Sequence, residues 1–140
     1  MTLKLTKALA ATNLADTCRI PVGEGFVVHI CQAATHNQSF LARMAKFKLQ
    51  FPDHPVADAK SPFWVDFQRG VLTADTEAFL CHVVVAGWEL TDDDGEQVPF
   101  SPELFAEEIL STPSGRVIAN KLLQATSQQH MFELEQTTKN

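Results

Sequence analysis

Three residues with metal-binding side chains, Cys18, His29 and Cys31, lie in the first quarter of the chain. Residues 26–31 are rich in β-branched side chains, which predicts a strand. On a strand His29 and Cys31 share one face, so together with Cys18 they could form a metal site. Structural zinc sites, however, use close-spaced ligand pairs such as CxxC or HxxxH, and the chain has neither. We therefore favour the half-covered face of a sheet and expect no metal and no cofactor.

Three consecutive aspartates precede Gly95 and raise the possibility of a calcium loop. If Gly95 took the sixth position of such a loop, the first position would be Leu90 and the twelfth would be Ser101. Neither residue has the carboxylate that those positions require. The sequence therefore favours a solvated acidic turn.

Nucleophilic and phosphate-binding chemistry has no sequence signature here. Cys81 and His82 are neighbours, about 100° apart on a helix, so they cannot form a nucleophile–base pair with each other. The P-loop, G-x-G-x-x-G, G-x-S-x-G and H-E-x-x-H patterns do not occur, and there is no tyrosine. We expect a protein that is not an enzyme and has no catalytic residue. The alternative is a metal protein or small hydrolase that uses Cys18, His29 and Cys31.

Length and composition indicate one globular domain spanning residues 1–140, with flexible ends at 1–15 and 136–140. The chain has 140 residues, 45% hydrophobic and 20% charged, which is typical of a protein with a single core. A net charge of −6 argues against nucleic acid as a partner. No run approaches the ~20 apolar residues of a membrane span, and there is no signal-peptide pattern, so we expect reduced thiols in a cytoplasm.

The hydrophobic pattern predicts an α+β fold that is mostly helical, with an N-terminal β-hairpin pairing residues 16–21 with 25–31. Thr35 and Gln38 match a capping box at the start of an amphipathic helix. Its apolar face carries Phe40, Leu41, Met44, Phe47 and Leu49, and its other faces carry Arg43, Lys46 and Lys48. Thr73 to Asp75 cap a later helix, in which residues 79–86 suit either a helix or a strand.

Residues 88–103 contain the most specific local signals. Asp94 and Gly95 form a preferred central pair for a type I′ turn, which predicts a short β-ribbon near residues 88–100. Pro99 leaves the second arm at most half-paired. Helix starts follow at Ser101-Pro102 and at Thr112-Pro113, and we expect the second of these helices to extend towards Phe132 and Leu134.

The segment Gly87-Trp-Glu-Leu-Thr-Asp-Asp-Asp-Gly-Glu-Gln-Val-Pro-Phe-Ser-Pro-Glu103 resembles the tail assembly chaperones of long-tailed bacteriophages. Proteins of that group often carry a Trp, an acidic Asp-Gly turn and an apolar-Pro-Phe-Ser cluster that leads into a helix. The close match covers about seventeen residues. The order of the remaining elements, a β-rich start followed by helices, is similar too.

The resemblance implies a non-enzymatic protein of the host cytoplasm that binds the tape measure protein, helps to recruit tail tube subunits and is absent from the mature virion. It allows self-association. A programmed frameshift often extends some copies in that family, and Thr138-Lys139-Asn140 is compatible with the slippery codons ACA AAA AAC. The alternative from another class is a structural virion protein, such as a head–tail connector or tail terminator.

A chaperone of this kind needs apolar surface to share with a helical client, and acidic surface elsewhere to stay soluble. Two apolar clusters are candidates for partner binding, and the core is the alternative location for both. Their residues are Phe63, Trp64 and Phe67 in the first cluster, and Met131, Phe132 and Leu134 in the second.

Overall fold

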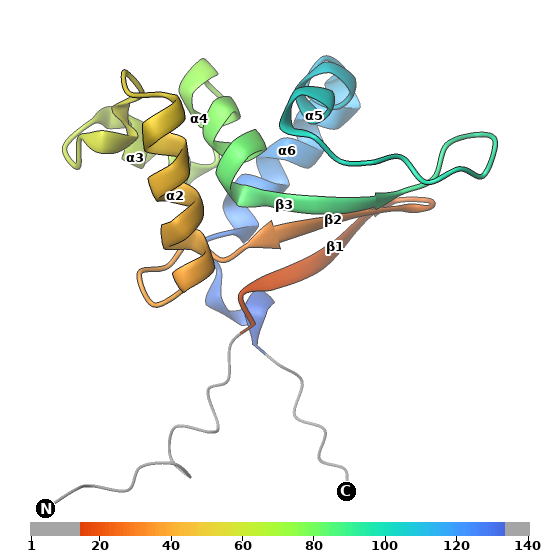
Figure 1. Cartoon of the computed structure of the whole chain (residues 1–140), viewed down its shortest axis with the longest axis horizontal. Coiled ribbons are helices and arrows are strands. Elements are labelled where there is room, and N and C mark those ends of the chain that lie inside the picture. Colours follow the sequence, from red (N-terminus) through yellow and green to blue (C-terminus); the bar gives the residue numbers. More distant parts are fainter. Residues whose placement is uncertain (1–14, 134–140) are drawn as a thin grey trace, which may run out of the picture.

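The computed structural model describes residues 15–133 (Figure 1). Within that range five helices pack with one antiparallel sheet, which confirms the predicted α+β class and the predominance of helix. The strands are β1 (Thr17–Gly23), β2 (Phe26–Cys31) and β3 (Val85–Leu90). The helices are α2 (Gln38–Gln50), α3 (Pro62–Arg69), α4 (Ala74–Phe79), α5 (Pro102–Glu108) and α6 (Pro113–Ala125), with short helical turns η1 (Pro55–Ala57), η2 (Leu80–Val84) and η3 (Gln129–Phe132).

The predicted N-terminal hairpin is present, and it is part of a larger sheet. β1 pairs with β2, and β2 pairs with β3, all antiparallel, in the order β1-β2-β3. Val28 and Ile30 of β2 face the core and are fully buried. The turn between the first two strands uses Gly25 at φ +66°, where glycine has no steric cost. The sheet therefore joins the N-terminal hairpin to a strand from the middle of the chain.

The stretch 79–86, which suited either helix or strand, is both. α4 continues into the π-helical turn η2, and Val85 then changes directly to extended backbone and begins β3. Figure 1 shows the helix entering the strand without a loop. Leu80, Val83 and Val84 are fully buried because η2 packs against α2, α5 and α6 at once. This junction is the centre of the core.

The acidic ribbon differs in detail from the expected type I′ turn. Gly95 has φ +80°, but Asp94 does not have a positive φ, so the expected central pair is wrong. The N–H of Gly95 instead donates to the carbonyl of Asp92 (3.0 Å), which makes Asp93 and Asp94 the central residues of the turn. The carboxylate of Asp92 accepts hydrogen bonds from the backbone N–H groups of Asp94 and Glu96. A short acidic side chain thus shapes the turn, as in an Asx-turn.

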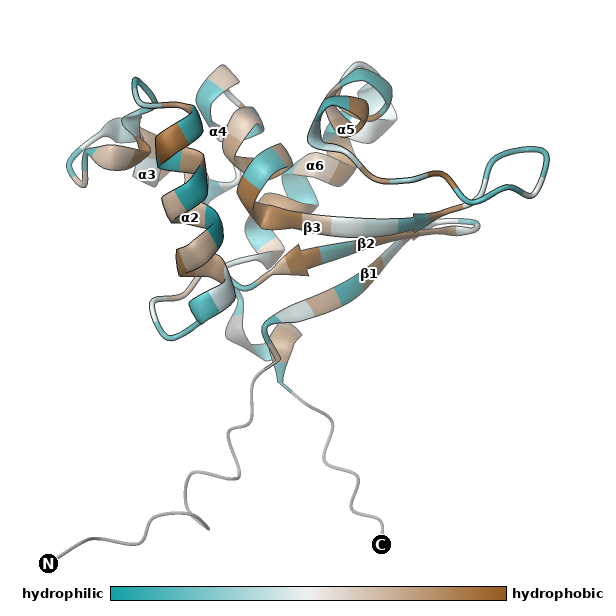
Figure 2. Ribbon diagram, in the orientation of Figure 1, coloured by the Kyte–Doolittle hydropathy of each residue, from teal (hydrophilic) through white to brown (hydrophobic). Residues whose placement is uncertain are grey.

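The second arm of the ribbon is as incompletely paired as Pro99 predicts. Beyond β3 the two arms are joined by a single bridge between Thr91 and Gln97, and Val98 donates its N–H to the carbonyl of Leu90. Figure 2 shows the loop at the tip as hydrophilic. The ribbon then leads directly to the cap of α5.

Helix starts are confirmed at Ser101 and Thr112, each a cap followed by proline, and at Thr73. The capping box at Thr35 is wrong. Asn37 caps α2 instead, because its side-chain oxygen accepts from the N–H of Ser39 (3.1 Å) while its amide group donates to Asp16 and Gln32 carbonyls. α6 ends at Ala125, short of the predicted extension; Leu134 lies outside the described residues.

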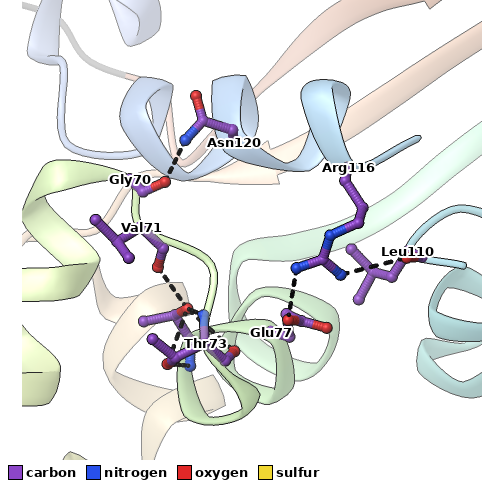
Figure 3. Close-up of polar contacts among 8 residues, drawn as sticks. Gly70, Val71, Thr73, Glu77, Leu110, Arg116 and Asn120 are labelled. Carbon is purple, nitrogen blue, oxygen red and sulfur yellow. Dashed lines mark hydrogen bonds and ion pairs between the residues drawn. The ribbon is translucent and has the colours of Figure 1, made fainter. Parts of the chain in front are cut away.

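Polar contacts connect α6 to α4 and to the end of α3 (Figure 3). Arg116 forms an ion pair with Glu77 (3.1 Å), and Asn120 donates to the carbonyl of Gly70 at the end of α3. Thr76 donates to the carbonyl of Val71 in the connecting loop. These contacts hold α3, α4 and α6 as one helical layer beside the sheet.

Arg43 of α2 stabilises the helix-to-strand junction. Its guanidinium donates hydrogen bonds to the carbonyls of His82 (3.2 Å), Val83 (2.8 Å) and Val85 (2.8 Å). These carbonyls lie where the change from π-turn to strand ends the regular helical pairing, so they need another donor. The expectation that Arg43 lies on a polar outer face of α2 is therefore wrong: it is half-buried against β3.

We expect Arg43→Met to lower the free energy of unfolding by about 2 kcal/mol or more, because three carbonyls in the core lose their donor. Urea denaturation followed by circular dichroism measures it. Lys46→Met on the same helix is the matched control: its side chain is exposed, so a change within about 0.5 kcal/mol is expected. Equal losses in the two variants would contradict a special role for Arg43.

Candidate functional site

The three sequence candidates for a metal site do not converge. Cys18 pairs with Ile30 across the hairpin and shares its core-facing side, whereas His29 lies on the opposite face of the sheet. Cys31 is fully buried and accepts a hydrogen bond from Asn37 (3.5 Å). Across residues 15–133 no group of three His, Cys, Asp or Glu side chains is placed to hold a metal ion. The expected half-covered face of the sheet therefore holds for His29, whereas Cys31 belongs to the core.

The thiols are not activated as nucleophiles. Burial raises the pKa of Cys18 to about 11 and that of Cys81 to about 12, and it raises the pKa of Cys31 as well. A nucleophilic cysteine needs the opposite shift, towards a thiolate at neutral pH. These thiols therefore behave as small apolar groups of the core.

The two histidines nearest the core serve packing. His54 is nine-tenths buried; its Nδ1 accepts the N–H of Val56 (2.9 Å) and its Nε2 lies 2.8 Å from the carbonyl of Asp75. His82 packs its ring against those of Phe47 and Phe51, and burial lowers its pKa. These backbone and aromatic contacts are those of side chains that support structure.

A charged cluster occupies the outer face of the sheet. Glu89 of β3 accepts two hydrogen bonds from the guanidinium of Arg19 (2.7 and 2.8 Å), and His29 lies 2.5 Å from the same carboxylate. The hydrogen bonds from Arg19, and then from His29, lower the pKa of Glu89 to about 2. The cluster connects all three strands and is open to solvent. We therefore interpret it as cross-strand pairing of opposite charges that stabilises the sheet.

Burial separates the predicted partner-binding residues into two groups. Phe63, Phe67 and Phe132 are at most 4% exposed and belong to the core. Trp64 is half-buried and Met131 is 37% exposed, so these two can touch another molecule without unfolding. The amphipathic pattern also misplaces Leu49, which is 85% exposed because it lies about 200° around the helix from Phe47.

Trp64 forms the centre of an apolar groove between α2 and α3. Two adjoining hollows, of about 290 and 250 Å³, share Trp64 and Met44 in their walls. Leu41 continues the wall along α2, one turn before Met44. Lys48 is the one charged residue among the described residues that line either hollow. We call this feature the α2–α3 groove.

Local sequence positions Trp64 closely. Ser61 caps α3, its hydroxyl accepting the N–H of Phe63, and Pro62 takes the first helical position. Phe63 and Phe67, four residues apart, anchor the buried side of the helix. The indole N–H of Trp64 donates to the carbonyl of Asp58 (3.1 Å), which leaves the ring's apolar surface free to line the groove.

The α2–α3 groove is suited to binding an apolar helix face. Such recognition places side chains spaced at i, i+3, i+4 and i+7 into a hydrophobic groove. Methionine and tryptophan are well suited to this, since methionine adapts its shape and tryptophan buries a large area.

No protein-family model, curated protein or solved structure matches this chain. Among residues 15–133 no helix has the length and apolar character needed to cross a bilayer.

Because no comparison gives a function, the role of the α2–α3 groove is inferred from its own residues and from the pattern of residues 87–103. From the sequence, Trp64 was a candidate for partner binding, but Met44 and Leu41 were not. The helical periodicity placed Met44 and Leu41 on the apolar face of the helix, but periodicity alone does not distinguish a residue in the core from a residue in the wall of a groove.

We expect the carboxyl of Glu89 to titrate near pH 2, below its ordinary pKa of 4.5. A folded pKa below the unfolded one means that Glu89 contributes stability above about pH 4.5, and that this contribution is lost as the pH falls towards 2. Side-chain carboxyl NMR measures the midpoint. Arg19→Ala should move it upward, whereas Arg69→Ala, which removes an exposed arginine of α3, should not. An unchanged midpoint in Arg19→Ala would contradict the assignment.

Proposed function

We propose that this protein is a tail assembly chaperone of a long-tailed bacteriophage: it binds the tape measure protein and helps to recruit tail tube subunits during tail morphogenesis. The observation that carries the proposal is the pattern of residues 87–103, with its Trp, acidic Asp-Gly turn and Val-Pro-Phe-Ser cluster before a helix. The α2–α3 groove supports it, because it offers an apolar surface to a helical client. The chaperone acts in the host cytoplasm and leaves before the virion matures.

The residues that carry the resemblance have a structural reason to occur together. The indole N–H of Trp88 donates to the carbonyl of Val98 (2.8 Å), which joins the two arms of the ribbon across the acidic turn. The ring of Trp88 meets Phe100 edge-on at 5.2 Å, just before the cap of α5. The segment thus positions α5 on the sheet, and we propose a different surface for the client.

The α2–α3 groove is the proposed client site. Met44 and Trp64 lie on two different helices and line both hollows, so a client helix laid along the groove would contact both. Lys48 at one end favours a client that presents an acidic or polar residue beside its apolar ridge. Binding here would hide apolar surface of both molecules until tail tube subunits arrive.

We expect Trp64→Ala and Met44→Ala each to weaken binding to a fragment of the tape measure protein from the same phage by about tenfold or more, the range for central aromatic and apolar anchors. Co-purification and calorimetry measure it. Leu49→Ala is the matched control, because Leu49 lies on α2, is exposed and lines neither hollow.

Two results would contradict the proposal in different ways. If no tape measure fragment binds the unaltered protein, the chaperone function is wrong. If fragments bind and all three variants bind equally well, the function stands and the α2–α3 groove is not the site. Mass spectrometry of purified virions tests the alternative of a structural virion protein, which would be retained in finished particles.

A further inference from the structure

A second groove, of different chemistry, lies between the acidic ribbon and α5. It has a volume of about 270 Å³, and its apolar walls are Trp88 and Leu90 of β3, Val98 of the second arm and Leu104 of α5. Two carboxylates, Asp92 and Glu108, also line it. We call it the ribbon–α5 groove. Its walls and those of the α2–α3 groove have no residue in common.

The charged residues in the segment that forms the ribbon and α5 are all acidic. Residues 92–108 hold seven acidic side chains and no Lys, Arg or His; the acids are Asp92, Asp93, Asp94, Glu96, Glu103, Glu107 and Glu108. The other 10 acids of the chain are matched by all 11 of its basic residues. The whole net negative charge of the protein is therefore concentrated in this one segment, which forms one side of the groove.

No basic side chain among the described residues forms an ion pair with these carboxylates, although that of Asp92 accepts two backbone hydrogen bonds within the turn. Among residues 15–133 the ion pairs involve Glu77 and Glu89, and none of the seven acids of the segment takes part in one. All seven are exposed. Like charges gathered at one edge raise the local negative potential and attract a cationic partner. The charges thus specify what kind of molecule the apolar walls would receive.

The groove is formed before any partner arrives. The ring of Trp88 is held by edge-on contacts with Phe26 (5.6 Å) and Phe100 (5.2 Å), by a tilted contact with Phe105 (6.2 Å) and by its hydrogen bond to Val98. A preformed pocket spares the partner the cost of ordering these side chains. Leu104 and Glu108 are one helical turn apart on α5, so an apolar contact and a charged contact lie side by side.

We propose that the ribbon–α5 groove binds a basic amphipathic segment of a partner protein, with an apolar side chain between Leu90 and Leu104 and Lys or Arg side chains against Asp92 and Glu108. The proposal does not rest on the chaperone function or on the α2–α3 groove. A second copy of this chain is the rival occupant.

The experiment uses Trp64→Phe as the background, which leaves Trp88 as the single tryptophan and hence as a reporter inside the groove. The probe is a short synthetic amphipathic helix of Leu and Lys. The matched probe carries Glu in place of every Lys. We expect the Lys peptide to change the emission of Trp88 saturably, with an affinity that falls steeply as salt is raised. The Glu peptide should bind at least about tenfold more weakly.

Two variants of α5 distinguish binding in the groove from a general attraction to the acidic surface. Glu108→Lys reverses a charge that lines the groove, and Glu107→Lys makes the same change on the neighbouring residue, which does not line it. Both lie in the last turn of α5, where a cation favours the helix, so both should fold. Glu108→Lys should weaken binding of the Lys peptide about tenfold or more, and Glu107→Lys should change it several-fold less.

Three outcomes would overturn the proposal. The first is an unchanged Trp88 emission at every concentration of the Lys peptide. The second is an equal weakening by the two charge-reversal variants, which would mean a diffuse attraction to the acidic surface. The third is a Glu108→Lys variant that binds the peptide normally while its sedimentation coefficient shifts, which would make a second copy of the chain the occupant.

Discussion

The structure depends on the three hydrogen bonds that Arg43 donates to the carbonyls of the helix-to-strand junction. A helix that widens into a π-turn and then becomes a strand leaves carbonyls without their usual partners at a partly buried position. One planar guanidinium with several donors can satisfy such a set, and a single ammonium group is less suited to it. Because Arg43 comes from α2, the same contact also sets the position of that helix against β3.

Local signals in the sequence predicted those elements whose instructions lie within a few residues. The serine and threonine caps followed by proline at α5 and α6 are examples, since a cap acts on the N–H groups just after it. The N-terminal hairpin is another, because its turn and its apolar alternation are adjacent. Asn37 shows the limit. It replaces Thr35 as the cap because its amide also reaches the carbonyl of Asp16, 21 residues away, and a local pattern does not contain that contact.

The candidate binding surface was harder to predict than the fold. The aromatic group around Trp64 was recognisable, but two of its three members, Phe63 and Phe67, are buried and anchor α3 in the core. Phe67 contributes to the floor of one hollow, and Trp64 is the half-exposed member of the group. Whether an apolar residue lines a groove depends on how far apart two helices lie, and the spacing within one helix does not determine this. Arg43 was missed for a related reason: its basic side chain suggested solvent, while its partners come from a junction 40 residues later.

The loop-free passage from α4 through η2 into β3 has a consequence for how the two grooves are held. α2 forms one wall of the first groove and is hydrogen-bonded through Arg43 to Val85, the first residue of β3. Trp88 of the second groove lies three residues further along the same strand. No flexible linker intervenes, so the grooves keep a constant separation. A single partner that carried a suitable segment for each proposed groove would bind the second segment at a high effective concentration once the first was in place, provided that its own spacing matched. If both proposed grooves take segments of one partner, the junction would act as a rigid spacer that favours partners whose two segments lie a matching distance apart.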